Sequence, residues 1–128
     1  MRWLLCLIGS TRVSVPTDAI RHIVEYEVGP PPPLTSPYLA GIGVLTDELV
    51  LSVRVGFRPT ARTRRTKGLL LSAKAGALGW AFEIDQVVGL VNDGPRESLQ
   101  SEPAWLLRTR SGDRFLEVPT MLQMLGGA

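Results

Sequence analysis

Short apolar runs recur along the chain, and Gly, Pro, Ser and Asp separate them. This rhythm is typical of an all-β protein, because short strands alternate with tight turns. Residues 3–8 and 12–15 flank a Gly-Ser-Thr turn and predict an opening hairpin. Residues 105–109 and 114–118 flank a Ser-Gly-Asp turn and predict a closing one.

The centre of the chain predicts a helical turn over residues 19–23, a strand over residues 23–28, and a second strand over residues 48–57. In the first strand the expected packing residues are Ile23, Tyr26 and Val28. In the second, one face carries four apolar residues: Leu49, Leu51, Val53 and Val55. The opposite face, with Val50, Ser52 and Arg54, is predicted to be half solvated.

The second half predicts strands over residues 68–73, 78–84 and 87–91, and a polar loop over residues 92–104. Pro119 and Thr120 open a short helix over residues 121–125, which ends at a Gly-Gly pair. The expected fold is all-β, with two small five-stranded barrel-like subdomains and one short C-terminal helix. Each half has too little apolar surface to fold alone.

A basic segment separates the two halves and contains no acidic residue. Its cations are Arg58, Arg62, Arg64, Arg65 and Lys67. We expect residues 58–67 to form a solvated connecting loop between a first subdomain over residues 1–60 and a second mainly over residues 68–125. The alternative is that these cations contact an acidic partner or the phosphates of a nucleic acid.

Composition narrows the class of protein further. A chain of 128 residues with a net charge of +2 suits one domain, and this charge does not indicate a nucleic-acid partner. The single cysteine, Cys6, excludes an internal disulfide and fits a reducing cytoplasm, where we expect it to be a buried, inert thiol. No stretch reaches the roughly twenty apolar residues of a membrane helix, so a soluble, cytoplasmic protein is expected.

Candidate catalytic groups do not converge in the sequence. His22 is the only histidine, so paired-histidine metal sites are excluded and His22 is expected to be partly exposed. The carboxylates Glu25 and Glu27, and likewise Glu83 and Asp85, are predicted to be solvated. We therefore expect no catalytic residue, no cofactor site and no metal site. The sequence does not indicate an enzyme.

The order and spacing of five segments resemble the CheW-like family, the adaptor fold of bacterial chemosensory arrays. The segments are WLLCLIGSTRVSVP, TDAIRHIVEY, SPYLAGI, GLLLSAKAGALGWAFEIDQVVGLV and AWLLRTRSGDRFLEVPTMLQML. The resemblance implies a non-catalytic adaptor or scaffold of a two-component pathway. Its partners would be a methyl-accepting chemotaxis-type receptor, whose helix docks between two barrels, and a CheA-type histidine kinase or another CheW-like protein. Neither membrane insertion nor a nucleic-acid partner is implied.

This chain departs from the family at its signature turn, where the family has Asn-Leu-Arg-Gly. Here Val44, Leu45, Thr46 and Asp47 stand in its place, so a planar cation is lost and a negative charge is added. The loop over residues 92–104 is also shorter than the family linker, which could remove an edge element of a barrel. These departures predict that one interface, that with the kinase, is weakened or lost. The residues that resemble the receptor side of the family are Ile42, Val44, Leu45, Thr46 and Asp47.

Overall fold

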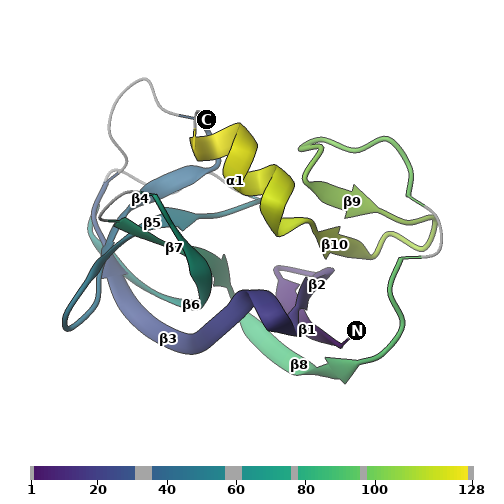
Figure 1. The fold of residues 1–128 in the computed structure, drawn as a ribbon, viewed down its shortest axis with the longest axis horizontal. Coiled ribbons are helices and arrows are strands. Elements are labelled where there is room, and N and C mark those ends of the chain that lie inside the picture. The colour runs from purple at the N-terminus through teal and green to yellow at the C-terminus, as the bar shows by residue number, and fades with distance from the viewer. Residues whose placement is uncertain (1, 31–35, 57–61, 76–77, 96–97, 127–128) are drawn as a thin grey trace. The chain divides into compact units, whose positions relative to one another are not determined.

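The computed structural model describes residues 2–30, 36–56, 62–75, 78–95 and 98–126. The contacts divide the chain into two compact units. Unit 1 combines Met1–Ala19 with Gln86–Ala128, and unit 2 is the continuous segment Ile20–Asp85. The predicted all-β class, with two five-stranded sheets and a short C-terminal helix, is confirmed (Figure 1).

Unit 1 contains a five-stranded sheet with the strand order β8-β1-β2-β10-β9. β1 (Trp3–Ile8) and β2 (Thr11–Pro16) form the predicted opening hairpin, in which Ile8 lies opposite Thr11. Gly9, at φ +60, provides the left-handed conformation of this two-residue turn. β8 (Gln86–Val91) pairs with the other side of β1. A 3₁₀ turn (Thr17–Ala19) follows β2.

The closing hairpin of unit 1 joins β9 (Leu106–Arg108) to β10 (Arg114–Leu116), as predicted but with shorter strands. β10 also pairs with β2, in parallel. The helix α1 (Val118–Gly126) starts three residues before its predicted start. Its first turn accepts Pro119, because a first-turn residue needs no intrahelical N–H donor.

Unit 2 is a closed barrel with the strand order β3-β4-β5-β7-β6. Its strands are β3 (Ile20–Val28), β4 (Leu39–Val44), β5 (Leu49–Val53), β6 (Arg64–Ala75) and β7 (Leu78–Ile84). Antiparallel pairs join all neighbours except β5 and β7, which run parallel. The predicted helical turn over residues 19–23 is wrong from Ile20 onward, because Ile20 and Ile23 pair with β6.

The predicted basic loop over residues 58–67 is wrong in its last part. β6 begins at Arg64, and Arg64 to Lys67 pair with β3 in register from Val28 to Glu25. Four charged or polar residues hid this strand start, since apolar alternation begins only after Lys67. The boundaries of the two units therefore differ from the predicted division near residues 58–67. β6 belongs to the barrel of unit 2, and the N-terminal hairpin belongs to the same unit as residues 86–128.

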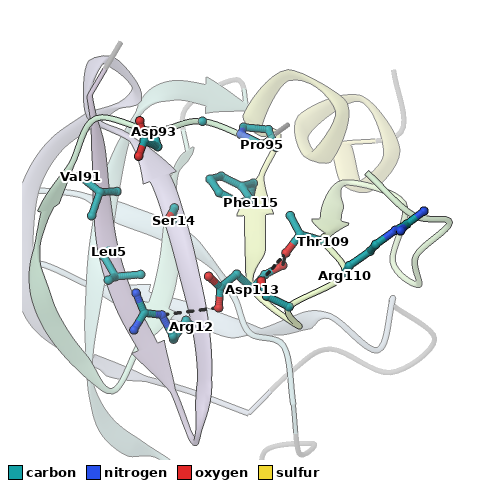
Figure 2. A pocket seen from close by; sticks show the side chains of 12 residues that line it. Leu5, Arg12, Ser14, Val91, Asp93, Pro95, Thr109, Arg110, Asp113 and Phe115 are labelled. Atoms are coloured by element: carbon teal, nitrogen blue, oxygen red, sulfur yellow. Dashed lines mark hydrogen bonds and ion pairs between the residues drawn. The ribbon is translucent and has the colours of Figure 1, made fainter. Parts of the chain in front are cut away.

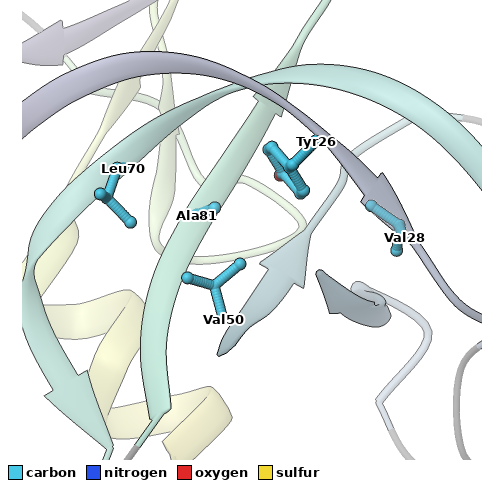
Figure 3. Packing of buried hydrophobic residues seen from close by; sticks show 5 residues of the cluster. All are labelled: Tyr26, Val28, Val50, Leu70 and Ala81. Atoms are coloured by element: carbon cyan, nitrogen blue, oxygen red, sulfur yellow. The ribbon is translucent and has the colours of Figure 1, made fainter. Parts of the chain in front are cut away.

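One cluster of buried residues in the barrel, which we call the core cluster, consists of Tyr26, Val28, Val50, Leu70 and Ala81 (Figure 3). Two glycines on neighbouring strands make room for the Tyr26 ring. A Cβ at Gly43 or at Gly68 would lie 2.7 Å from Tyr26 atoms, closer than carbon contacts allow. Tyr26 and Val28 are thus packing residues as predicted, whereas Ile23 is 51% exposed.

Candidate protein-binding site

The hairpin between β4 and β5 carries most of the residues that the sequence indicates as a receptor-side surface. The Leu45 N–H donates to the Glu48 carbonyl at 2.9 Å, which leaves Thr46 and Asp47 as the two-residue tip. Both tip residues are exposed. The turn that differs in sequence from the Asn-Leu-Arg-Gly motif is therefore accessible, at the end of the barrel hairpin.

Val44 and Leu49 lie opposite each other on β4 and β5, directly before and after this turn. Their exposed fractions are 56% and 46%, so two large apolar side chains face solvent side by side. We call Val44, Thr46, Asp47 and Leu49 the hairpin patch. Neighbouring exposed apolar side chains of this kind are typical of contact surfaces.

The structure separates the predicted residues into two groups. Val44, Thr46 and Asp47 are exposed, while Ile42 and Leu45 are half-buried. Leu45 packs against the barrel core cluster, so its first role is structural. Leu49 was not among the predicted site residues. The sequence contains a signal that could have identified Leu49 as a site residue. Leu49 and Val44 are equally distant from the two-residue tip, so they must face each other across the hairpin.

The basic segment does not form a continuous positive surface on the part of the chain that the structure describes. Arg62 is exposed, but Arg65 lies opposite Glu27 on β3, and the half-buried Lys67 lies opposite Glu25. Arg65 also reaches Glu25 at 3.9 Å. Opposite charges directly across a sheet offset each other. Arg58 lies outside the described residues.

Arg64, the remaining cation of the basic segment, forms an ion pair with the buried carboxylate of Glu83. Its two terminal nitrogens donate to the two Glu83 oxygens at 2.6 and 2.8 Å. The Arg54 guanidinium lies 3.6 Å from the Glu83 carboxylate. The Ser52 hydroxyl donates a hydrogen bond to the same carboxylate at 2.5 Å, and it forms a second hydrogen bond of 2.8 Å with the Tyr26 hydroxyl. Glu83 is fully buried, so its predicted solvation is wrong. Asp85 is the exposed residue of the predicted carboxylate pair, and it accepts a hydrogen bond from Arg54.

This network also corrects the predicted solvation of one face of the β5 segment. The face with Val50, Ser52 and Arg54 is buried rather than half solvated. On the predicted packing face, Val53 and Val55 are buried as expected, Leu51 is half-buried and Leu49 is exposed.

Ser52 and Arg54 are tolerated on this buried face because both interact with Glu83. The Ser52 hydroxyl donates a hydrogen bond to the carboxylate, and the Arg54 guanidinium forms an ion pair with it. Burial, the largest cause, raises the pKa of Tyr26, so its phenol stays protonated at neutral pH. We interpret the network as structural, since it is enclosed by the barrel strands.

Other candidate chemical groups are dispersed. His22, Glu25 and Glu27 are exposed on β3, as predicted. Cys6 is buried, and burial raises its pKa to about 11, as expected for an inert thiol. Among the described residues no cluster of His, Cys, Asp and Glu has the arrangement of a metal site. Over the same ranges, no helix has both the length and the apolar character required to cross a membrane.

Comparison with solved structures finds the scaffolding protein TtCheW of Thermoanaerobacter tengcongensis. The match has a TM-score of 0.61 at 10% sequence identity and covers 90% of this chain and 87% of that chain. No protein-family model matches the sequence. The search of curated proteins likewise finds no match. At this identity the likeness establishes the fold, which is CheW-like.

Proposed function

We propose that the protein is a non-catalytic adaptor that works by protein–protein contact in a bacterial chemosensory two-component pathway. The observation that carries the proposal is the exposed apolar pair Val44 and Leu49, at the end of a barrel hairpin in a CheW-like fold. A scaffold acts through such surfaces rather than through reactive groups. The similar solved structure is itself named a scaffolding protein, which supports this class of function.

The hairpin patch is the proposed contact surface for the cytoplasmic region of a methyl-accepting chemotaxis-type receptor. Such a region presents helices, and an amphipathic helix buries its apolar face against exposed apolar side chains. Val44 and Leu49 supply that area, and Thr46 and Asp47 supply a polar rim. Leu45 packs against the core cluster, and the half-buried Ile42 lies on the same face of β4 as Val44. The proposed receptor contact implies that the adaptor works in the cytoplasm, at receptor arrays.

Coupling to a CheA-type histidine kinase is proposed to be weakened. Thr46 and Asp47 replace the arginine and glycine of the family turn, and both side chains are exposed. A partner that offers a carboxylate to the family arginine would meet a hydroxyl and a negative charge here, which disfavours binding. Another CheW-like protein remains the alternative partner for this interface.

A paired substitution tests the receptor contact. Val44→Asp places a charge within the hairpin patch, and Val88→Asp places the same charge at a similarly exposed valine on β8. We expect Val44→Asp to weaken binding to a receptor cytoplasmic fragment at least tenfold, measured by calorimetry, with an unchanged melting temperature. Val88→Asp should bind like the parent protein. Full binding by Val44→Asp would overturn the proposed surface.

The kinase proposal has its own measurement. Binding to the isolated kinase regulatory domain is compared between this protein and a standard adaptor that carries Asn-Leu-Arg-Gly. We expect weaker binding by this protein, and a gain when Thr46→Arg and Asp47→Gly are introduced together. Equal affinity of this protein and the standard adaptor would show that the interface is retained.

A regulatory module that uses residues 58–67 on an acidic partner or nucleic acid is the second class of function. The structure disfavours it, because Arg64 is bound to Glu83 and Arg65 faces Glu25 and Glu27. Receptor binding that persists from low to high salt supports the adaptor. Tight, steeply salt-dependent binding to a polyanion would support the second class.

A further inference from the structure

Unit 1 contains a cavity of about 520 Å³ that the adaptor function does not use. Its lining comes from β1, β2, β8 and β10 and from the segments that follow β8 and β9 (Figure 2). This volume is within the range of small-molecule sites in proteins. All the lining residues belong to unit 1.

One row of residues across the sheet contains two small residues beside the cavity-lining residues Leu5 and Phe115. Gly89, Leu5, Ser14 and Phe115 lie side by side in one row across β8, β1, β2 and β10. A Cβ added at Gly89 would meet no atom within 4 Å, and Ser14 carries only a hydroxymethyl group. Ser14 lines the cavity, so its small side chain leaves room there that a large one would fill.

Ser14 supplies a polar group inside the cavity. The residue is 4% exposed and lines the cavity wall. Within the described ranges the Ser14 hydroxyl has no hydrogen-bond partner. Its oxygen is not completely enclosed by protein, so it keeps one accessible side. A buried hydroxyl normally finds a partner, because leaving it unsatisfied costs free energy. The open side of this hydroxyl is the cavity, where a ligand can satisfy it.

The cavity has an apolar part and four charged lining residues, Arg12, Asp93, Arg110 and Asp113. Leu5, Val91 and Phe115 form the apolar part, with Arg12 below Leu5 and Asp93 beyond Val91 in Figure 2. Arg12 pairs with Asp113 only through Nε, at 3.5 Å, and both side chains are substantially exposed. Such pairs are weak, so the terminal guanidinium nitrogens remain able to bind a carboxylate. Asp93 has no ion-pair partner among the described residues.

The strand register gives the separation of these charges. Arg12 lies opposite Leu7 on β1, and Val91 lies opposite Trp3, four residues further along. At about 3.3 Å per residue this is roughly 13 Å along the strand. Asp93 follows Val91 by two residues, so its backbone lies beyond this distance, but the Arg12 and Asp93 side chains both line the cavity. Because an arginine side chain is long, a ligand with charges about 10 Å apart, the length of an extended tripeptide, can meet both.

We infer that this cavity is a binding site for a small zwitterion with an apolar body, the chemistry of a free apolar tripeptide. Its ammonium group binds Asp93, its carboxylate binds Arg12, and its side chains pack against Leu5, Val91 and Phe115. The Ser14 hydroxyl hydrogen-bonds to its backbone. This inference does not depend on the adaptor function.

The test uses the tripeptide leucyl-alanyl-leucine as the probe on the full chain. Amide chemical shifts are followed by NMR during titration to millimolar peptide, alongside the N-acetylated, C-amidated form of the same peptide. We expect saturable shifts at Ser14 and Phe115 with the free peptide. Binding of the blocked peptide should be at least tenfold weaker, because both of its terminal charges are absent.

Two pairs of variants locate the site. Arg12→Met and Asp93→Asn should each weaken peptide binding about tenfold. Their controls, Arg62→Met and Asp47→Asn, change exposed residues of the same types in unit 2 and should leave the affinity unchanged. Val44→Asp should also leave it unchanged, so that failure of the receptor proposal and failure of this one are distinguishable.

Three outcomes would overturn the inference. The first is an absence of shifts with the free peptide at millimolar concentration. The second is equal binding of the free and blocked peptides. The third is unchanged affinity of both Arg12→Met and Asp93→Asn. Because both substitutions alter exposed side chains, neither is expected to unfold the protein.

Discussion

Arg64 and Glu83 form a bidentate ion pair between the neighbouring barrel strands β6 and β7, with nitrogen–oxygen distances of 2.6 and 2.8 Å. The carboxylate is fully buried, whereas the arginine side chain keeps 24% of its area exposed. A buried carboxylate requires compensation by charge and hydrogen bonds, and Arg54 and Ser52 complete it. The first cation of β6 is therefore a structural part of the barrel.

Removal of the charge at this centre should destabilise the protein. Glu83→Gln keeps the side-chain shape but leaves Arg64 without its carboxylate and Arg54 with Asp85 as its counterion. We expect a cost of about 3 kcal/mol in the free energy of unfolding. The matched control is Glu25→Gln, which removes an exposed partner of Arg65 and should cost at most about 0.5 kcal/mol. Urea denaturation measures both values. Similar costs for the two variants would contradict a structural role for Glu83.

The glycines around Tyr26 predict a second contrast in stability. A Cβ at Gly68 would lie 2.7 Å from the Tyr26 hydroxyl oxygen, so Gly68→Ala must displace the ring or the strand. We expect a loss of about 1–3 kcal/mol, typical of overpacking. Gly89→Ala adds the same atom on β8, where it meets nothing within 4 Å, and should be neutral or slightly stabilising. Equal melting temperatures of the two variants would show that the barrel relaxes freely around the tyrosine.

Adjacent residues of the hairpin should respond differently to the same charge. Leu45 packs against the core cluster, so Leu45→Asp should lower the free energy of unfolding by more than about 2 kcal/mol. Val44 is exposed, and Val44→Asp should change it by less than about 0.5 kcal/mol. Thermal unfolding followed by circular dichroism compares the two. A stable, folded Leu45→Asp variant would instead assign Leu45 to the contact surface.

Burial of Cys6 predicts a protected thiol and an alkaline loss of stability. Its pKa is raised to about 11 from 9.0, so the native state disfavours the thiolate and labelling by a disulfide reagent at pH 8 should be much slower than in urea. Because the folded pKa is the higher one, the associated stability is full below about pH 9 and declines as the pH rises toward 11. Cys6→Val should weaken this decline. Rapid native labelling would show that the sheet opens readily around β1.

Local patterns in the sequence anticipate much of the fold. The opening hairpin follows from two apolar runs around Gly9, and the closing one from Gly112 at φ +90 between short strands. The strand start at Arg64 could not be predicted in the same way, because its partners on β3 lie about 40 residues earlier in the chain. The predicted site was found in part. The turn at Thr46 and Asp47 is exposed, whereas Leu45 is partly buried by core packing.

By itself, the sequence determined the all-β class and the positions of the tight turns, because turn chemistry and strand alternation act over a few residues. It also placed the signature-turn segment at a hairpin tip. Only the tertiary structure decided that the Ser52 and Arg54 face is buried as well, since a carboxylate from β7 stabilises both side chains inside the barrel. It likewise joined the N-terminal hairpin to residues 86–128, through pairings of β1 with β8 and β2 with β10 that no local pattern encodes.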